Sequence, residues 1–368
     1  MASSVRYVGM DVHKESITIA VAEQGRDAAK EYCTVPNDVR QVLKALAGLG
    51  AKSKLRCCYE AGPTGYELYR VLTKHKLDCI VVAPSLVPVQ AGNRVKTDRR
   101  DAVKLAHFLR SGDLTAVYVP DAATEALRDL ERARDDAKCA ERVARHQLSK
   151  FLLRHGQRFS GGNEWTQKHM VWIRTLKFAH EAQQRVLCDY LKAVEDAAAR
   201  VAALTKDLAE LVETTALAPL VKALQALRGV RLVTAVTIAA ELGDLKRFDT
   251  PRQLMAFLGL VPSEHSSGGS KRRGRITRTG NTHVRRVLVE AAWSYQFRPN
   301  LSQEIRKRNE GVAPGVQRIA WQAQQRLHKR LFDLRRKGKS TQKAITAVAR
   351  ELAGFVWAIG QEEALLAP

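Results

Sequence analysis

The sequence predicts an α/β domain, then a helical coiled-coil segment, then a mainly α-helical C-terminal domain. Strand-like and helix-like segments alternate over roughly the first 110 residues. Strand signals are then missing from about Asp121 to Val221, and a Gly/Ser loop with a strongly basic run follows Leu224. A chain of 368 residues, 45% of them hydrophobic, can form two or three cores. We expect domains at residues 1–115, 116–222 and 223–368.

The predicted α/β domain begins with a β-hairpin. Arg6–Asp11 contains a short apolar run, and Ser16–Ala22 alternates polar and apolar residues as a half-buried strand does. Further along, the patterns predict a helix at about Val39–Leu49, a strand at Leu55–Tyr59, a helix at about Thr64–His75, a strand at Cys79–Ala83 and a helix from about Asp98. This β-β-α-β-α-β-α order is typical of an α/β sandwich.

The middle segment carries apolar residues at steps of three and four. They are Leu191, Val194, Ala198, Val201, Leu204, Leu208 and Leu211. This spacing predicts a helical hairpin or coiled coil, which the loop Gly161-Gly162-Asn163 divides into two arms. Because such a seam pairs with its own return helix or with a second subunit, a dimer is compatible with the pattern.

The charge of the chain predicts a polyanionic partner. Lysine and arginine number 61, and aspartate and glutamate 38, which leaves a formal charge of +23. Nucleic acid is the first candidate, because no apolar run reaches the roughly 18 residues that span a bilayer and no signal-peptide segment opens the chain. We therefore expect a soluble, cytoplasmic protein without a membrane partner. The six cysteines form no C-x-x-C pair, so we expect small buried residues rather than a zinc site.

Four acids lie where predicted elements end or begin. Asp11 closes the first strand, Glu60 follows the Leu55–Tyr59 strand, and Asp98 and Asp101 begin the helix after the last predicted strand. Residues three apart share a helix face, so Asp98 and Asp101 could point at one centre. Each acid alone is also typical of a helix N-cap or a turn. Together, three separate segments place carboxylates at one rim of the domain.

Gathered carboxylates require a cation, because each raises the pKa of its neighbours. Mg²⁺ prefers carboxylate and phosphate oxygens, and paired ions stabilise the attacking and leaving oxygens in phosphoryl transfer. The four acids are therefore predicted to bind Mg²⁺, with Mn²⁺ as a substitute. His13 and Lys14 follow Asp11, where a phosphate contact and a solvated loop are both open interpretations.

A serine-containing loop lies next to concentrated positive charge. Ser266-Ser267-Gly268-Gly269-Ser270 precedes a basic run without acids, which neutralises phosphates. Together with Arg231 upstream, the residues expected to bind nucleic acid are Lys271, Arg272, Arg273, Arg275, Arg278, Arg285 and Arg286. A serine here could attack phosphorus while arginines hold the phosphate oxygens, although a flexible linker is the ordinary interpretation. Leu227–Ala235 is typical of a helix-hairpin-helix turn, which binds phosphate through backbone N–H groups, but Arg231 replaces its usual second glycine.

Four ordered motifs carry a resemblance to a known family. They are Gly9-Met10-Asp11-Val12-His13-Lys14, Tyr59-Glu60-Ala61-Gly62-Pro63-Thr64-Gly65, Lys96-Thr97-Asp98-Arg99-Arg100-Asp101-Ala102, and the block from Phe257 through Ser267-Gly268 to Thr279-Gly280-Asn281. In these motifs, and over nearly its whole length, the chain resembles the transposases of insertion-sequence family one-ten.

The resemblance implies an RNase-H-like, RuvC-like DEDD domain at the N-terminus and a transposase domain at the C-terminus. Carried over by position, it implies that Asp11, Glu60, Asp98 and Asp101 are the metal ligands. It also implies that Ser267, or its neighbour Ser266, is the nucleophile that forms a phosphoserine link to DNA. Members of the family are similar in using a structured bridge RNA that pairs with donor and target DNA, and in acting as tetramers with composite active sites.

Two other functions stay open from the sequence. A RuvC-like junction nuclease would use the same carboxylates but cleave by water attack, and a non-catalytic nucleic-acid-binding protein would use the acids structurally. Strand exchange through a phosphoserine preserves phosphoester energy and needs no ATP. This agrees with the lack of a G-x-x-x-x-G-K-[ST] motif in the sequence.

Overall fold

The computed structural model describes residues 4–88, 97–267 and 270–362. The chain forms two compact units, residues 1–119 and 120–368. The first boundary lies close to the end of the predicted α/β domain. The residues predicted to form separate middle and C-terminal domains share the second unit.

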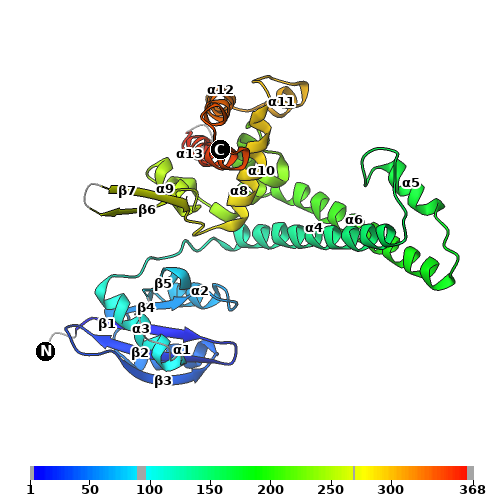
Figure 1. Cartoon of the computed structure of the whole chain (residues 1–368). Coiled ribbons are helices and arrows are strands. Elements are labelled where there is room, and N and C mark those ends of the chain that lie inside the picture. Colours follow the sequence, from blue (N-terminus) through cyan, green and yellow to red (C-terminus); the bar gives the residue numbers. More distant parts are fainter. Residues whose placement is uncertain (1–3, 89–96, 268–269, 363–368) are drawn as a thin grey trace. The chain divides into compact units, whose positions relative to one another are not determined.

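A five-stranded mixed sheet forms the centre of the first unit (Figure 1). Its strands are β1 (Arg6–Val12), β2 (Ser16–Glu23), β3 (Lys30–Pro36), β4 (Leu55–Glu60) and β5 (Asp78–Val82). The order across the sheet is β3-β2-β1-β4-β5, in which β1, β2 and β3 pair antiparallel and β1, β4 and β5 pair parallel. The predicted hairpin and both later strands are confirmed. The finer RuvC-like assignment stays a prediction.

Helices cover both faces of this sheet. One face packs against α1 (Val39–Gly48) and α2 (Glu67–Lys74) through large apolar residues such as Met10. The other face packs against α3 (Asp98–Ser111) through small residues, including Ala20. The 3₁₀ turns η1 (Lys52–Lys54) and η2 (Pro84–Leu86) join these elements. The unit is therefore the layered α/β arrangement that the alternating segments predict.

Two local predictions in this unit were wrong. Strand β3 was missed, because it is an edge strand with no fully buried residue and lacks the apolar run that marks an inner strand. Helix α2 begins at Glu67 rather than near Thr64. Its start is delayed because Gly65 has a positive φ of 69°, which belongs to a turn rather than to a right-handed helix.

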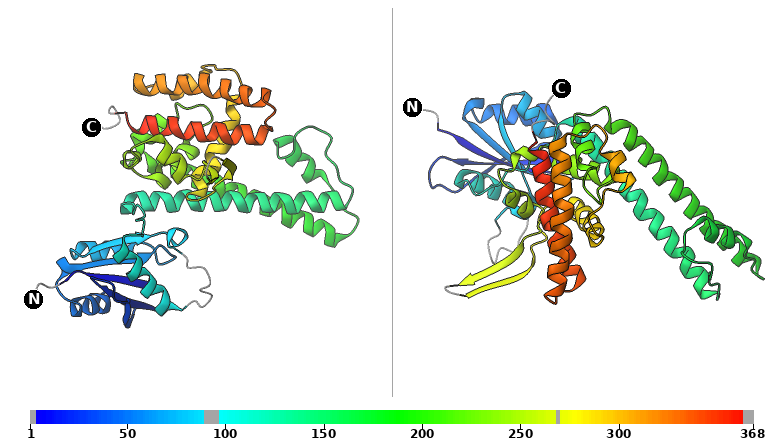
Figure 2. Two further views of the ribbon diagram at one scale, coloured as in Figure 1. Left: turned by 60° about the vertical axis from the view of Figure 1, so that its left-hand side comes forward. Right: turned by 90° about the horizontal axis from the view of Figure 1, so that it is seen from above.

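Two long helices dominate the first part of the second unit. Helices α4 (Ala122–Arg154) and α6 (Glu181–Val212) lie side by side in both Figures 1 and 2, with α5 (Gln167–Thr175) between them in the chain. The predicted glycine loop lies between α4 and α5. Of the predicted seam, Val194 and Leu208 are buried but Leu211 is 52% exposed. The helical hairpin is present, and the coiled-coil assignment stays a prediction.

A buried helix, α8 (Leu232–Leu242), lies at the centre of the remaining part. All of its residues from Ala235 to Leu242 are buried, as expected for a helix surrounded by others. The other described helices of this part are α7 (Ala218–Leu224), α9 (Pro251–Phe257), α10 (Thr282–Ala292), α11 (Gln303–Arg308), α12 (Pro314–Arg336) and α13 (Thr341–Gly360), with the 3₁₀ turns η3 (Leu245–Arg247) and η4 (Trp293–Gln296). Among the described helices, none is both long enough and apolar enough to cross a bilayer.

The cysteines behave differently in the two units. In the first unit, Cys57, Cys58 and Cys79 are buried, as predicted, and Cys33 is half-buried. Cys139 and Cys188 lie exposed on α4 and α6, so the prediction of buried cysteines was wrong for these two. A pair of packed helices buries only one stripe of each helix, which leaves most positions exposed to solvent.

Candidate active site

Close packing of α3 on β1 positions Asp11. Gly9 and Asp11 are two residues apart on β1 and therefore lie on the same face of the sheet, the face that α3 covers. A Cβ atom on Gly9 would lie 2.3 Å from the Ala102 carbonyl oxygen and 2.4 Å from the Ala106 nitrogen. The helix backbone thus lies directly on the strand. Because Asp98 precedes Ala102 by about one helical turn, this packing brings Asp98 to Asp11.

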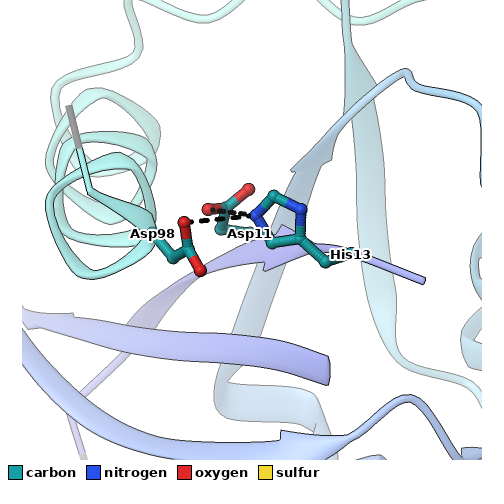
Figure 3. Close-up of side chains that lie close together, drawn as sticks. All are labelled: Asp11, His13 and Asp98. Carbon is teal, nitrogen blue, oxygen red and sulfur yellow. Dashed lines mark hydrogen bonds and ion pairs between the residues drawn. The ribbon is translucent and has the colours of Figure 1, made fainter. Parts of the chain in front are cut away.

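Asp11, His13 and Asp98 converge at this point (Figure 3). His13 Nε2 lies 3.2 Å from Asp11 Oδ2 and 3.4 Å from Asp98 Oδ1. The side chain of Asp11 is 18% exposed, whereas those of His13 and Asp98 are 51% and 61% exposed. The group is therefore anchored in the sheet but open to solvent on one side. The structure brings together two of the four predicted acids and adds His13. For His13 the sequence left two interpretations open, a phosphate contact and a solvated loop.

The electrostatic surroundings of Asp11 favour a positive partner. Burial raises the pKa of this carboxyl, the nearby His13 lowers it, and the carboxylates of Asp98 and Asp101 raise it further, so the pKa lies above its usual value. A cation between the carboxylates would reverse this effect, because it would stabilise the ionised form. Carboxylate oxygens are the hard donors that Mg²⁺ prefers, so the donor set fits a divalent cation.

The other two predicted acids lie beside this group. Glu60 ends β4, directly after Tyr59, which pairs with Met10 next to Asp11. Asp101 lies in the first turn of α3 and contributes to the raised pKa of Asp11. Glu60 and Asp101 line a common groove. Among the described residues, neither belongs to the close group around His13. Metal binding by all four acids stays a prediction.

A β-hairpin carries the predicted serine. Strands β6 (Pro262–Ser267) and β7 (Ser270–Ile276) pair antiparallel, with Ser267 opposite Ser270. The sequence predicted a loop and a basic run, but the basic run forms β7 instead, because backbone pairing does not require apolar side chains. The side chains of Ser266, Ser267, Lys271 and Arg273, and the residues Gly268 and Gly269, lie outside the part of the molecule that the structure describes. The side chains of Arg272, Arg275 and Arg278 are exposed.

Two family models match the two regions that carry these features. The model described as "Transposase IS116/IS110/IS902 family" matches residues 221–308, and a transposase model named for the DEDD transposases of IS110 matches residues 8–156. The chain is 46% identical to y4qE of Sinorhizobium fredii, named as a candidate transposase, over 97% of this chain and 88% of the relative. It is 34% identical to the transposase of insertion sequence IS1533 from Leptospira borgpetersenii, over 90% of this chain and 97% of the relative.

The chain belongs to the IS110 family of transposases. The resemblance seen in the sequence motifs is therefore confirmed. In this IS110 transposase, the first matched region contains the four predicted acids, and the second contains Ser267 and the basic run. An enzyme of this family cuts and rejoins DNA, so DNA is a partner of the chain.

Three of the arginines predicted to bind nucleic acid have partners within the transposase. Arg285 donates from Nη1 to the carbonyl oxygens of Leu258 and Thr279, each at 2.8 Å, where the hairpin joins the helical core. Arg286 pairs with Asp135 at 2.8 Å and with Glu290 at 3.3 Å, and Arg231 pairs with Glu304 at 3.0 Å. The contacts of Arg285 are structural. A nucleic-acid contact by any of the three stays a prediction.

A tight turn joins α7 and α8 where the sequence predicted a helix-hairpin-helix, and the helix-hairpin-helix assignment stays a prediction. Gly229 has a φ of 80°, and a Cβ atom there would lie 2.5 Å from the Ala291 carbonyl oxygen, so both the conformation and the space require glycine. Arg231 is the N-cap of α8 but makes no side-chain capping hydrogen bond. The turn therefore tolerates the replaced second glycine.

A largely buried polar network between α4, α8 and α10 was missed from the sequence. Glu131 of α4, Glu241 of α8 and His283 of α10 bring carboxylate and imidazole atoms within 4.8 Å of one another. Burial raises the pKa of Glu241, but hydrogen bonds from Arg132 and Asn281, each 2.7 Å, outweigh it and lower the pKa below its usual value. Because these donors already occupy the Glu241 oxygens, the network joins three helices rather than forming an open metal site.

Proposed function

We propose that this transposase cuts and rejoins DNA strands through a covalent link between Ser267 and DNA, beside a divalent cation held by Asp11, Glu60, Asp98 and Asp101. The observation that carries the proposal is the meeting of Asp11 and Asp98 where α3 begins, next to the groove that Glu60 and Asp101 line. Gathered acids cost free energy unless a cation joins them, which favours phosphoryl transfer over binding alone.

The residues of the chain hold this site in place. Packing of α3 on Gly9 fixes the distance between Asp11 and Asp98, and His13 Nε2 lies between their carboxylates. When bound, Mg²⁺, or Mn²⁺ in its place, would stabilise the negative charge that develops on the scissile phosphate. The exposed side of the group leaves room for a phosphodiester to approach.

The covalent step conserves the number of phosphoester bonds. The hydroxyl oxygen of Ser267 forms a bond to the scissile phosphorus, and the bond from phosphorus to one adjoining sugar oxygen breaks. The hydroxyl proton passes, directly or through solvent, to that sugar oxygen, so the departing strand ends in a free hydroxyl. A hydroxyl of another strand then attacks the phosphoserine, and the serine is released for a further cycle.

The proposal extends to the partners of the transposase. The four acids lie in the first compact unit and Ser267 lies in the second, which suits a composite site built from two chains of a dimer or tetramer. A formal charge of +23 suits simultaneous binding of donor DNA, target DNA and a structured guide RNA. We expect the transposase to act in the cytoplasm.

Trapping the covalent intermediate tests the mechanism. The full chain, purified with its copurifying nucleic acid, is incubated with Mg²⁺ and a plasmid that carries the ends of the element encoding it. After denaturation, protein linked to DNA is separated on a gel and mapped by mass spectrometry. We expect an adduct on Ser267 that Ser267→Ala abolishes and that the matched control Ser266→Ala retains. Asp11→Asn should lower adduct formation by roughly 10²-fold or more, as removal of transition-state stabilisation does.

Two results would contradict the proposal. DNA hydrolysis without an adduct, surviving Ser267→Ala, would indicate a junction nuclease that uses water. Unchanged DNA processing and Mg²⁺ affinity in Asp11→Asn would show that the acids are structural. Sequencing of the copurifying nucleic acid tests the guide RNA separately, since a discrete RNA species is expected rather than bulk polyanion.

A further inference from the structure

A basic groove adjoins the carboxylates of the first unit. Its volume is about 1580 Å³, which exceeds the roughly 300–1,000 Å³ of small-molecule sites. One wall is α3, and the other is the start of β3 with the connection before it. Its basic side chains outnumber the acidic Glu31, Glu60 and Asp101, and are Arg26, Lys30, Arg99, Arg100, Lys104 and Arg110. Size and charge together favour an extended polyanion over a small metabolite.

The walls of the groove are held together by two of these arginines. Arg99 Nε lies 3.0 Å from the Glu31 carboxylate, which ties the start of α3 to β3. Arg110 donates to the carbonyl oxygens of Glu23 and Asp27, which holds the β2–β3 connection against the other end of the helix. The groove is thus a feature of the packed fold, and its width depends on these two contacts.

Other cations of the groove remain available for a ligand. Within the described part of the chain, Arg26, Lys30 and Lys104 show no ion pair. Lys104 is half-buried and lies one turn after Asp101 on the same face of α3. Arg26 is exposed on the opposite wall, in the connection before β3. Positively charged side chains therefore lie on both walls of the groove, which leads to Asp101.

We infer that this groove binds the sugar-phosphate backbone of the DNA strand that is cut, with Lys104 on one wall and Arg26 on the other. The inference rests on the proposed function, because Glu60 and Asp101 mark the catalytic end of the groove. Four carboxylates repel a phosphodiester, and cations along its path offset this repulsion. Lysine and arginine side chains both suit the task, because backbone phosphates are bound as charges without sequence readout. The strand is DNA because the groove ends at acids that act on the strand being cut.

Site-directed cross-linking tests which nucleic acid occupies the groove. The exposed cysteines Cys139 and Cys188 are first replaced by serine, and this parent measures the background of the remaining cysteines. Lys104→Cys and Arg26→Cys are then introduced one at a time into the full chain and labelled with azidophenacyl bromide. The matched control is Lys44→Cys, which is exposed on α1 at the other face of the sheet. After irradiation with the plasmid substrate, cross-linked strands are sequenced.

We expect both groove positions to cross-link DNA near the cleavage site and the control to stay at background. Cross-links to RNA alone, or yields equal to those of Lys44→Cys, would overturn the inference. An adduct on Ser267 without groove cross-links would support the proposed function and contradict only the inference that the groove binds DNA. Groove cross-links without any serine adduct would contradict the covalent mechanism and support DNA binding in the groove.

Binding measurements give a second readout that does not require cleavage. Lys104→Gln should weaken DNA binding about tenfold, as loss of one charge-assisted contact does. It should also reduce the slope of log affinity against log salt concentration by about 0.7 to 0.9. Lys104→Arg keeps the charge and should therefore show the DNA affinity and the salt slope of the wild type. Lys44→Gln should change neither quantity. An unchanged salt slope in Lys104→Gln would overturn the phosphate contact.

Discussion

Replacing Gly9 by alanine should move α3 and separate Asp11 from Asp98. The added Cβ atom would lie 2.3 Å from the Ala102 carbonyl oxygen, 2.4 Å from the Ala106 nitrogen and 2.8 Å from a side-chain atom of Leu105. Two of these neighbours are backbone atoms in a buried helix and cannot rotate away. Ordinary contacts begin at 3.4 Å, so the helix must move away from β1 by about 1 Å.

The size of the effect follows from this displacement. Overpacking of a well-packed core costs about 1–3 kcal/mol, and the backbone contact places Gly9→Ala toward the upper end. Misplacement of a catalytic group by about 1 Å costs roughly 10²-fold in rate. We therefore expect a folded variant in which DNA processing falls by about two orders of magnitude and Mg²⁺ binds more weakly.

Hydrogen exchange is the suitable stability assay for this variant. All five tryptophans lie beyond residue 119, so tryptophan fluorescence does not report on the first unit. Exchange of the amides of α3 should speed up in Gly9→Ala and stay unchanged in the control Gly62→Ala, whose Cβ atom would come no closer than 3.9 Å to its nearest neighbour. Wild-type exchange and activity in Gly9→Ala would refute the close-packing argument.

Two further predictions concern the second unit. Burial raises the pKa of Glu131 above its usual 4.5, so its contribution to stability is lost as pH rises from 4.5 through the folded-state pKa. Glu131→Gln should therefore be more stable than wild type near neutral pH but not near pH 4.5, as measured by thermal unfolding with tryptophan fluorescence; equal pH profiles would contradict this. Arg285→Ala removes the donor shared by the Leu258 and Thr279 carbonyls, and should cost about 1–3 kcal/mol locally. Hydrogen exchange at the base of the hairpin should therefore speed up, and unchanged exchange would contradict the structural role of Arg285.

Local signals predicted the elements around the four candidate metal-ligating acids well. The Thr97 hydroxyl accepts from the Arg100 N–H and caps α3, so the helix begins at Asp98 as predicted. Strands β1, β2, β4 and β5 follow from short apolar runs or from alternation. The edge strand β3 and the hairpin β6–β7 were not predicted, because their pairing depends on a partner strand rather than on apolar side chains.

The role of arginines was the least predictable feature of the second unit. In the sequence, Arg285 and Arg286 are simply members of a basic run. In the folded chain, Arg285 bonds two carbonyl oxygens and Arg286 pairs with Asp135, which lies about 150 residues earlier in the sequence. No local pattern reveals such partners, because the residues next to an arginine in the sequence do not show whether its side chain faces solvent or pairs with a distant segment.

The sequence by itself determined the family, the alternation of strands and helices, and the acids that begin or end them, because these depend on residue order and short-range periodicity. Only the tertiary structure decided which side chains meet. Asp11 reaches Asp98 because Gly9 lets a helix backbone lie on a strand, and His13 joins them because that packing leaves its imidazole between two carboxylates. Contacts of this kind arise between segments far apart in the chain, where the space left by a missing side chain matters as much as any residue that is present.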